Sequence, residues 1–96
     1  MPAPQKKFVC QYTSAVLSCP LSTVLTITSA IWGRTDVNQC GFVSVNNCRL
    51  NVTSNIKAKC DRTNHCSLRA SGSFGSEPCK GVSKYLEIDY VCRKGK

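Results

Sequence analysis

Side chains that carry out catalysis are scarce in this sequence of 96 residues. It has one histidine, His65, and five acidic residues in all. The acids are Asp36, Asp61, Glu77, Glu87 and Asp89. Catalysis needs a positioned nucleophile and base, or a pair of carboxyl groups. No motif brings such a set together, so we expect a protein that is not an enzyme and a His65 that is an ordinary surface residue.

The same shortage argues against a metal or a cofactor. Calcium takes six to eight oxygen ligands, usually with several carboxylates among them. Structural zinc sites use cysteine or histidine pairs about two to four residues apart, whereas the closest cysteines here, Cys60 and Cys66, lie six apart. We therefore expect no metal site, no cofactor and calcium-independent ligand binding.

Long apolar segments are also missing. No run of about 18 apolar residues is present, so we expect no membrane-spanning helix in this fragment. The first ten residues, MPAPQKKFVC, lack the apolar core of a signal peptide. We expect that the chain is a fragment with its own starting methionine or that a precursor has been trimmed.

Cysteine, by contrast, is abundant. Eight cysteines are spread along the chain, at positions 10, 19, 40, 48, 60, 66, 79 and 92. An even number in a short chain predicts four disulfides and an oxidising compartment, so the protein is secreted or is the extracellular part of a surface protein. Spacing alone leaves 105 pairings open. The triplet Asn51-Val52-Thr53 is a glycosylation sequon and fits a secreted origin.

The net charge of +8 is concentrated near the chain ends. Five of the thirteen lysines and arginines lie in residues 1–9 and 93–96, and without them the charge would be +3. We predict a flexible basic tail at 1–9, a folded domain at 10–92 and a basic tail at 93–96. A nucleic-acid partner is not expected. The tails either hold the domain near an anionic surface, such as sulfated glycans, or are simply solvated.

Alternating hydrophobicity predicts strands at 15–19, 24–29, 66–70 and 84–92. Val52, Ile56 and Cys60 are four apart, which predicts one short helix over 53–60, with Thr53 or Ser54 as its N-cap. Segments 33–48 and 71–83 are predicted loops. The expected fold is mostly β with one short helix (α+β): a compact, antiparallel, β-sandwich-like domain with long disulfide-stapled loops.

Two motifs and the cysteine spacing point to a family. AIWGRTD stands at 30–36, FGSEPCKGVSKYLEIDYVC at 74–92, and Cys10 and Cys19 are nine apart. From Cys10 to Cys92 the chain resembles the sea-urchin-egg-lectin (SUEL) type domain, the rhamnose- and galactose-binding lectin family. The resemblance implies a disulfide pattern that spacing could not give: Cys10–Cys40, Cys19–Cys92, Cys48–Cys79 and Cys60–Cys66.

The resemblance also implies a shallow sugar pocket. Gly33, Arg34, Gly81 and Lys84 match the family, and Trp32 takes the place of its aromatic residue. Gln11 stands where sugar-binding members usually have Glu, Ile31 where they have Asn, and Glu77 where they have Asp. A lysine donates to sugar hydroxyls, a carboxylate accepts from them, and an aromatic ring covers the apolar C–H face.

Each predicted contact has a structural alternative. Trp32 either stacks on a sugar or fills a gap beside the core, and Lys84 either binds ligand or is solvated; we expect both at the rim of the pocket. Arg34 contacts ligand or pairs with Asp36 or a loop carbonyl, and Glu77 contacts ligand or accepts backbone N–H bonds.

Two function classes remain. One is a calcium-independent lectin module for galactose- or rhamnose-like glycans on cell surfaces. The other is a protein-binding adhesion module of a receptor or secreted protein with a degenerate sugar pocket, which the changes at Gln11 and Ile31 favour.

Overall fold

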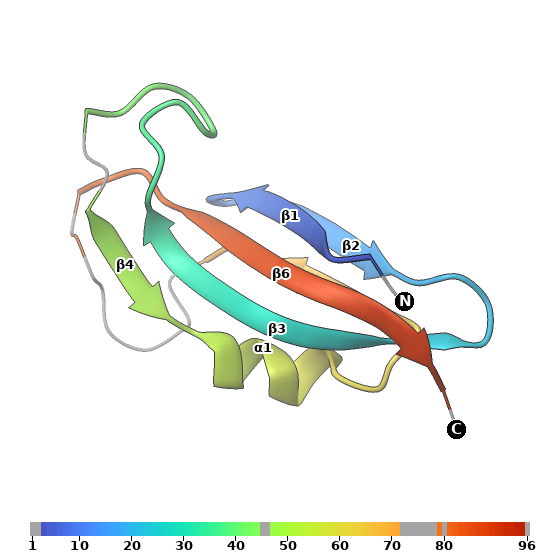
Figure 1. The fold of residues 1–96 in the computed structure, drawn as a ribbon. Coiled ribbons are helices and arrows are strands. Elements are labelled where there is room, and N and C mark those ends of the chain that lie inside the picture. Colours follow the sequence, from blue (N-terminus) through green and yellow to red (C-terminus); the bar gives the residue numbers. More distant parts are fainter. Residues whose placement is uncertain (1–2, 45–46, 72–78, 80, 96) are drawn as a thin grey trace.

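The computed structural model describes residues 3–44, 47–71, 79 and 81–95. A four-stranded antiparallel sheet has the order β1-β6-β3-β4, and a separate two-stranded sheet pairs β2 with β5 (Figure 1). The elements are β1 (Gln5–Cys10), β2 (Ser14–Ser18), β3 (Thr23–Arg34), β4 (Cys48–Asn51), α1 (Thr53–Cys60), β5 (His65–Arg69) and β6 (Tyr85–Lys94). The predicted fold class, mostly strands with one short helix, is confirmed.

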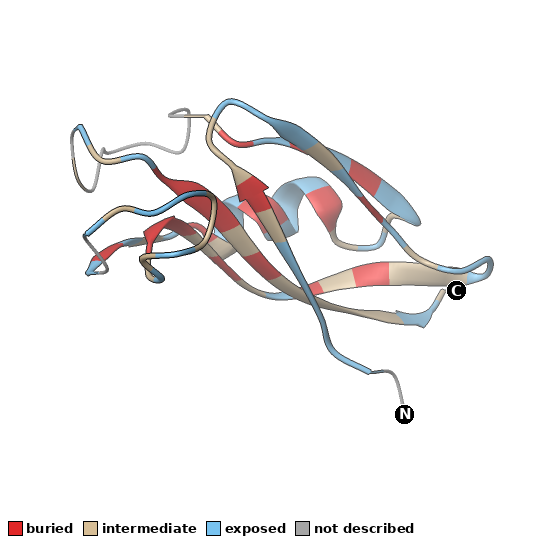
Figure 2. Cartoon of the chain, turned by 90° about the horizontal axis from the view of Figure 1, so that it is seen from above, coloured by how far each residue is buried: buried red, intermediate tan, exposed pale blue. Residues whose placement is uncertain are grey.

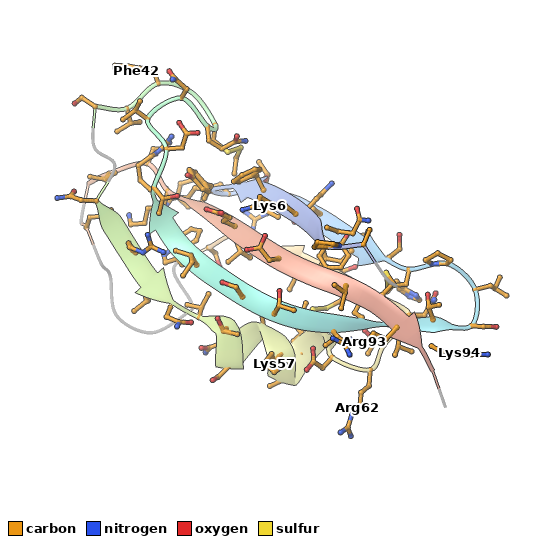
Figure 3. The ribbon with its side chains drawn as sticks, in the orientation of Figure 1. Lys6, Phe42, Lys57, Arg62, Arg93 and Lys94 are labelled. Carbon is orange, nitrogen blue, oxygen red and sulfur yellow. A yellow bond between two sulfur atoms is a disulfide. The ribbon has the colours of Figure 1, made fainter. Side chains whose placement is uncertain are left out.

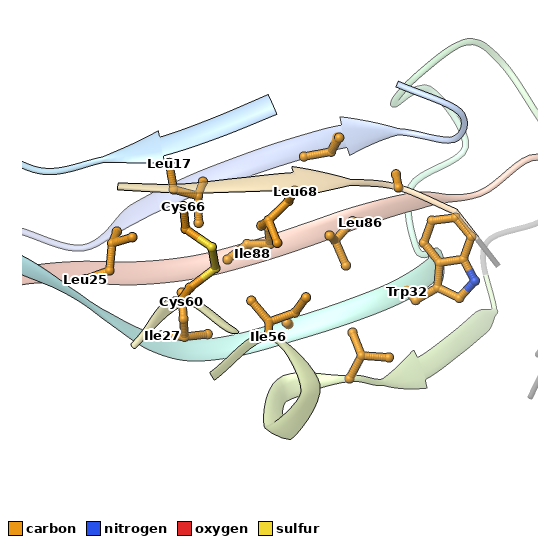
Figure 4. Packing of buried hydrophobic residues seen from close by; sticks show 14 residues of the cluster. Leu17, Leu25, Ile27, Trp32, Ile56, Cys60, Cys66, Leu68, Leu86 and Ile88 are labelled. Atoms are coloured by element: carbon orange, nitrogen blue, oxygen red, sulfur yellow. A yellow bond between two sulfur atoms is a disulfide. The ribbon is translucent and has the colours of Figure 1, made fainter. Parts of the chain in front are cut away.

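The core lies between the large sheet and a second layer made of β2, β5 and α1. Strand alternation supplies it: in β5 only Cys66 and Leu68 are buried, and Figure 2 shows buried residues alternating with more exposed ones along the strands. The main sheet contributes apolar residues of β3 and β6, which meet Leu17 of β2 and Ile56 of α1 (Figure 4). The Cys60–Cys66 disulfide ties α1 to β5 within this cluster.

All four disulfides implied by the family resemblance are present. Their members are Cys10–Cys40, Cys19–Cys92, Cys48–Cys79 and Cys60–Cys66. The Cys19–Cys92 bond spans 73 residues of sequence. In the chain-entropy model a loop of that length contributes roughly 4 kcal/mol, which is a large share of the stability of a small domain.

Helix α1 spans the predicted residues, but its predicted cap is wrong. No side chain caps the helix at its N-cap residue, Val52. Instead, the Thr53 hydroxyl accepts from the Ala30 N–H at 2.9 Å and donates to the Ala30 carbonyl at 3.3 Å. β4 pairs only with the last four residues of β3, so the backbone N–H and C=O groups along the rest of that edge have no partner strand in the described part of the chain. Thr53 provides hydrogen-bond partners for two of these groups, those of Ala30.

Further along the same edge of β3, side chains from the end of α1 bond to the backbone where the strand is irregular. The register between β3 and β6 shifts between Ile27 and Ser29. At this point the Ile27 N–H donates to the Asp61 carboxylate at 2.7 Å, and its carbonyl accepts from the Lys57 ammonium at 2.9 Å. Lys57, labelled in Figure 3, and Asp61 are also paired with each other at 2.9 Å, and their two bonds to Ile27 hold the end of the helix against the strand.

The predicted tails are wrong where the structure describes them. Residues 5–9, expected to be flexible, belong to β1, because Val9 is buried and the segment pairs with β6. Lys6 lies 2.8 Å from Glu87 and 3.3 Å from Asp89, and these hydrogen-bonded carboxylates raise the pKa of Lys6. Arg93 and Lys94, expected in the C-terminal tail, are the last residues of β6 (Figure 3).

Candidate functional site

Some of the predicted site residues meet where β1 ends and β6 begins. Gln11 directly follows β1, and Lys84 directly precedes β6. The Gln11 N–H donates to the Lys84 carbonyl at 3.0 Å, and the Lys84 N–H donates to Oε1 of Gln11 at 2.9 Å. The Gln11 side chain thus continues the strand ladder by one more bond. Its carboxamide oxygen is engaged with Lys84, so the carboxamide NH₂ is the group it can offer to a ligand.

An open hollow of about 370 Å³ lies at this junction. Its lining residues are Gln11, Tyr12, Gly81, Val82, Ser83 and Lys84. Gly81 has a left-handed backbone, with φ +84°, which glycine adopts without the steric cost of a side chain. Nearby, the Val82 N–H donates to the Cys79 carbonyl, and Cys79 is bonded to Cys48 of β4. Three predicted residues, Gln11, Gly81 and Lys84, are therefore brought together.

Lys84 was predicted to lie at the rim of the pocket, and this prediction is wrong, because the residue is only 2% exposed. Its ammonium donates to the Val82 carbonyl at 2.8 Å, within the wall of the hollow. A side chain held in this way has little conformational freedom to lose when a ligand binds. This geometry suits a fixed hydrogen-bond donor better than a solvated lysine.

Trp32 is also buried, at 1% exposure, so its predicted position at the rim is wrong. The predicted strand covered only residues 24–29, but β3 continues to Arg34. Trp32 there faces Leu50 of β4 and Leu86 of β6 in the pairing register. With strands on both sides, its side chain is part of the core (Figure 4), where it cannot cover the face of a sugar.

Arg34 has the structural role given as its alternative. It is fully buried, and its Nε donates to the Ser83 carbonyl at 3.0 Å. Its Nη1 faces three carbonyls of the following loop, those of Asp36, Gln39 and Gly41. Its guanidinium also lies 5.1 Å from the centre of the Tyr85 ring. Arg34 therefore joins the loop after β3 to Ser83, a lining residue of the hollow.

Gly33 and Ile31 contribute to the sheet rather than to the hollow. A Cβ on Gly33 would lie 2.1 Å from the Cys48 carbonyl oxygen, so only glycine allows β4 to approach this closely. Ile31 pairs with Asn51 of β4 and Glu87 of β6. The position where the family has Asn therefore lies in the middle of the sheet.

The remaining predicted residues lie elsewhere. Glu77 falls outside the described residues. Asn51 is exposed at the end of β4, where its Oδ1 accepts from the Thr53 N–H at 3.0 Å, and its glycosylation stays a prediction. His65 is exposed, as expected. In residues 3–44, 47–71, 79 and 81–95, no group of three or more His, Cys, Asp or Glu side chains could hold a metal ion.

Three residues that line the hollow were missed by the sequence analysis: Tyr12, Val82 and Ser83. Tyr12 is 70% exposed and lies on the hollow next to Gln11. Its backbone is in the left-handed region, with φ 67°, which is rare for a bulky residue. Hydrophobic alternation carries no sign of such a backbone. The available signal was its place directly after Gln11, the residue already predicted to contact ligand.

A hollow lined by the turn after β1 and the segment before β6, with hydrogen-bonding side chains in a small four-disulfide domain, is typical of a binding module. A family model described as the D-galactoside/L-rhamnose binding SUEL lectin domain matches residues 17–92. This match covers most of the sequence, and the chain belongs to that family.

Individual relatives agree with this assignment. The chain is 34% identical to an L-rhamnose-binding lectin, SML, of Scomberomorus niphonius, in an alignment of 88% of this chain and 44% of that protein. It is 32% identical to a D-galactoside-specific lectin of Heliocidaris crassispina, over 92% of this chain and 90% of the relative. It is 34% identical to L-rhamnose-binding lectin ELEL-1 of Echinometra lucunter, over 94% and 92% respectively. The chain thus spans less than half of the first relative and nearly all of the other two.

Proposed function

We propose that the domain is a carbohydrate-binding module for galactose- or rhamnose-like glycans and that it works outside the cell. The observation that carries the proposal is the hollow where Gln11 and Lys84 bond to each other, in a member of a lectin family. The four disulfides support an extracellular setting, because such bonds persist in oxidising compartments. No helix in the described part of the chain has the length and apolar character to cross a membrane.

The chemistry of the hollow suits a neutral sugar. A sugar hydroxyl both donates and accepts, so it can accept from the Lys84 ammonium and from the Gln11 NH₂ group. Charge-assisted bonds are roughly twice as strong as neutral ones. Gln11 supplies no carboxylate, so we expect weak binding by a single domain. Glutamate at this position would keep one oxygen on the Lys84 N–H and present a charged acceptor with the other.

The test compares the parent with Gln11→Glu and Lys84→Met by NMR titration with methyl galactoside and methyl rhamnoside. Gln11→Glu should tighten neutral-sugar binding several-fold and weaken any binding to sulfated glycans, because it adds a negative charge. Lys84→Met should weaken neutral-sugar binding at least tenfold. Lys59→Met on the exposed face of α1 is the matched control and should bind like the parent. EDTA should change none of these affinities.

The same titrations test the alternative, a protein-binding adhesion module. The departures from the family pattern at Gln11 and Ile31 favour it. If Gln11→Glu is well folded and still binds no neutral sugar, the lectin proposal is refuted and the adhesion module takes its place. If EDTA abolishes binding and calcium restores it, the calcium-independent mechanism is wrong.

A further inference from the structure

A sugar site needs an apolar surface as well as hydrogen-bonding groups. In galactose, three C–H groups line one face of the ring, and 6-deoxyhexoses carry a methyl group; both pack favourably against an aromatic ring. The sequence predicted Trp32 for this contact, but the Trp32 side chain is buried in the core. Of the described residues that line the hollow, Tyr12 is the aromatic one.

The turn that presents Tyr12 is fixed at both ends. The Tyr12 N–H donates to the Ala70 carbonyl at 2.7 Å, and the Ala70 N–H donates to the Thr13 carbonyl at 3.0 Å. The Thr13 N–H and hydroxyl both donate to the Cys10 carbonyl, at 3.0 and 2.6 Å. Cys10 is bonded in turn to Cys40. These contacts give the ring a fixed base beside Gln11.

The backbone of Tyr12 stores strain that its side chain does not offset by burial. A left-handed φ of 67° brings the Cβ of an L-residue close to its own backbone, which glycine avoids. Tyr12 is nevertheless 70% exposed as a residue, so packing against the core does not explain a tyrosine at this position. Such strain is concentrated at functional sites, where surrounding contacts hold it in place.

We propose that the Tyr12 ring forms one wall of the sugar site and packs against the apolar face of a hexose or 6-deoxyhexose. The hydroxyls of that sugar then face Gln11 and Lys84. This inference rests on the proposed lectin function and adds a residue that sets specificity. Tyr12 selects sugars with an uninterrupted C–H face or a methyl group, whereas the polar residues respond to hydroxyl positions.

Because of the backbone strain, a role of Tyr12 in binding can be distinguished from a role in stability. Tyr12→Gly removes both the ring and the backbone strain, so it should melt at the same temperature as the parent or higher. It should nevertheless bind methyl galactoside and methyl rhamnoside about tenfold more weakly. Tyr12→Phe keeps the ring and should bind within about twofold of the parent. Val16→Ala, at an exposed apolar residue of β2 away from the hollow lining, is the control and should leave binding unchanged.

A second measurement reports on the contact itself. Ring currents should shift the C–H protons of the bound sugar upfield in the parent and in Tyr12→Phe, and this shift should be absent in Tyr12→Gly. If Tyr12→Gly binds as tightly as the parent while Lys84→Met does not bind, the role of Tyr12 is overturned and the lectin function stands. If neither the parent nor a well-folded Gln11→Glu binds either sugar at millimolar concentration, both proposals are overturned.

Discussion

Replacing Arg34 by lysine keeps the positive charge, but we expect it to lower the stability of the domain substantially. The guanidinium bonds in two directions, from Nε to the Ser83 carbonyl and from Nη1 to the loop carbonyls of Asp36, Gln39 and Gly41. A lysine has one nitrogen at the end of a flexible stem, so it cannot reproduce a rigid planar fork. It can serve one side of this network and leaves the other side unsatisfied.

The size of the loss follows from those contacts. Each bond from a charged donor is worth roughly 1.5–3 kcal/mol, and at least one would be lost. Loss of the guanidinium over the Tyr85 ring, 5.1 Å away, adds about 1 kcal/mol. We therefore expect Arg34→Lys to lower the free energy of unfolding by about 2.5–4 kcal/mol. In a domain of this size, each kcal/mol shifts the melting temperature by roughly 4–8 °C.

Differential scanning calorimetry under non-reducing conditions measures this shift directly. Arg34→Lys should melt more than about 10 °C below the parent, consistent with 4–8 °C per kcal/mol. Arg49→Lys is the matched control, because Arg49 is exposed on β4, and it should melt with the parent. A melting temperature for Arg34→Lys close to that of Arg49→Lys would refute the two-sided network and with it the structural role of Arg34.

Two further predictions concern stability. Trp32→Ala should cost about 3–5 kcal/mol of unfolding free energy, because the side chain is buried, and Trp32→Phe should cost clearly less. Denaturant unfolding of the two variants measures this loss, and a Trp32→Ala variant as stable as the parent would show that Trp32 does not pack in the core. Burial tends to raise the pKa of Asp61, but the Ile27 N–H and Lys57 outweigh it and leave the pKa lowered. A lowered folded-state pKa gives stability that is present above the unfolded value of about 3.9 and is lost as pH falls through the folded value. Asp61→Asn should therefore flatten the fall in melting temperature below about pH 4, and a curve parallel to the parent's would count against this ion pair.

The parts of the fold that follow from local periodicity could be predicted from the sequence. The alternation in 84–92 and the four-residue spacing of Val52, Ile56 and Cys60 each reflect one buried face, and both elements are found at those places. The N-terminal strand was missed because its two lysines, which follow Pro2 and Pro4 closely, resemble a solvated tail. The acids that pair with Lys6 in this strand, Glu87 and Asp89, lie 81 and 83 positions further along the sequence, so local periodicity gives no sign of them.

The candidate site divides in the same way. Gln11, Gly81 and Lys84 were predicted together because a family motif keeps their relative positions. The burial of Trp32 depends on β4, a strand of four residues after a long loop, and its pairing leaves no periodic signal in AIWGRTD. Tyr12 was missed because its exposure follows from a left-handed turn that is defined by hydrogen bonds to residues as distant as Ala70.

The antiparallel pairing of β1 with β6 also determines where a covalent neighbour could be attached. Gln5 pairs with Tyr90 and Cys10 with Tyr85, so the hollow lies at one end of these strands and both termini lie toward the other (Figure 1). At about 3.3 Å per residue, the ten residues of β6 separate the two ends by roughly 30 Å. Further domains joined at either terminus would leave the hollow open, and several copies in one chain could bind one glycan-covered surface together. Linked weak sites of this kind gain avidity without any new contact.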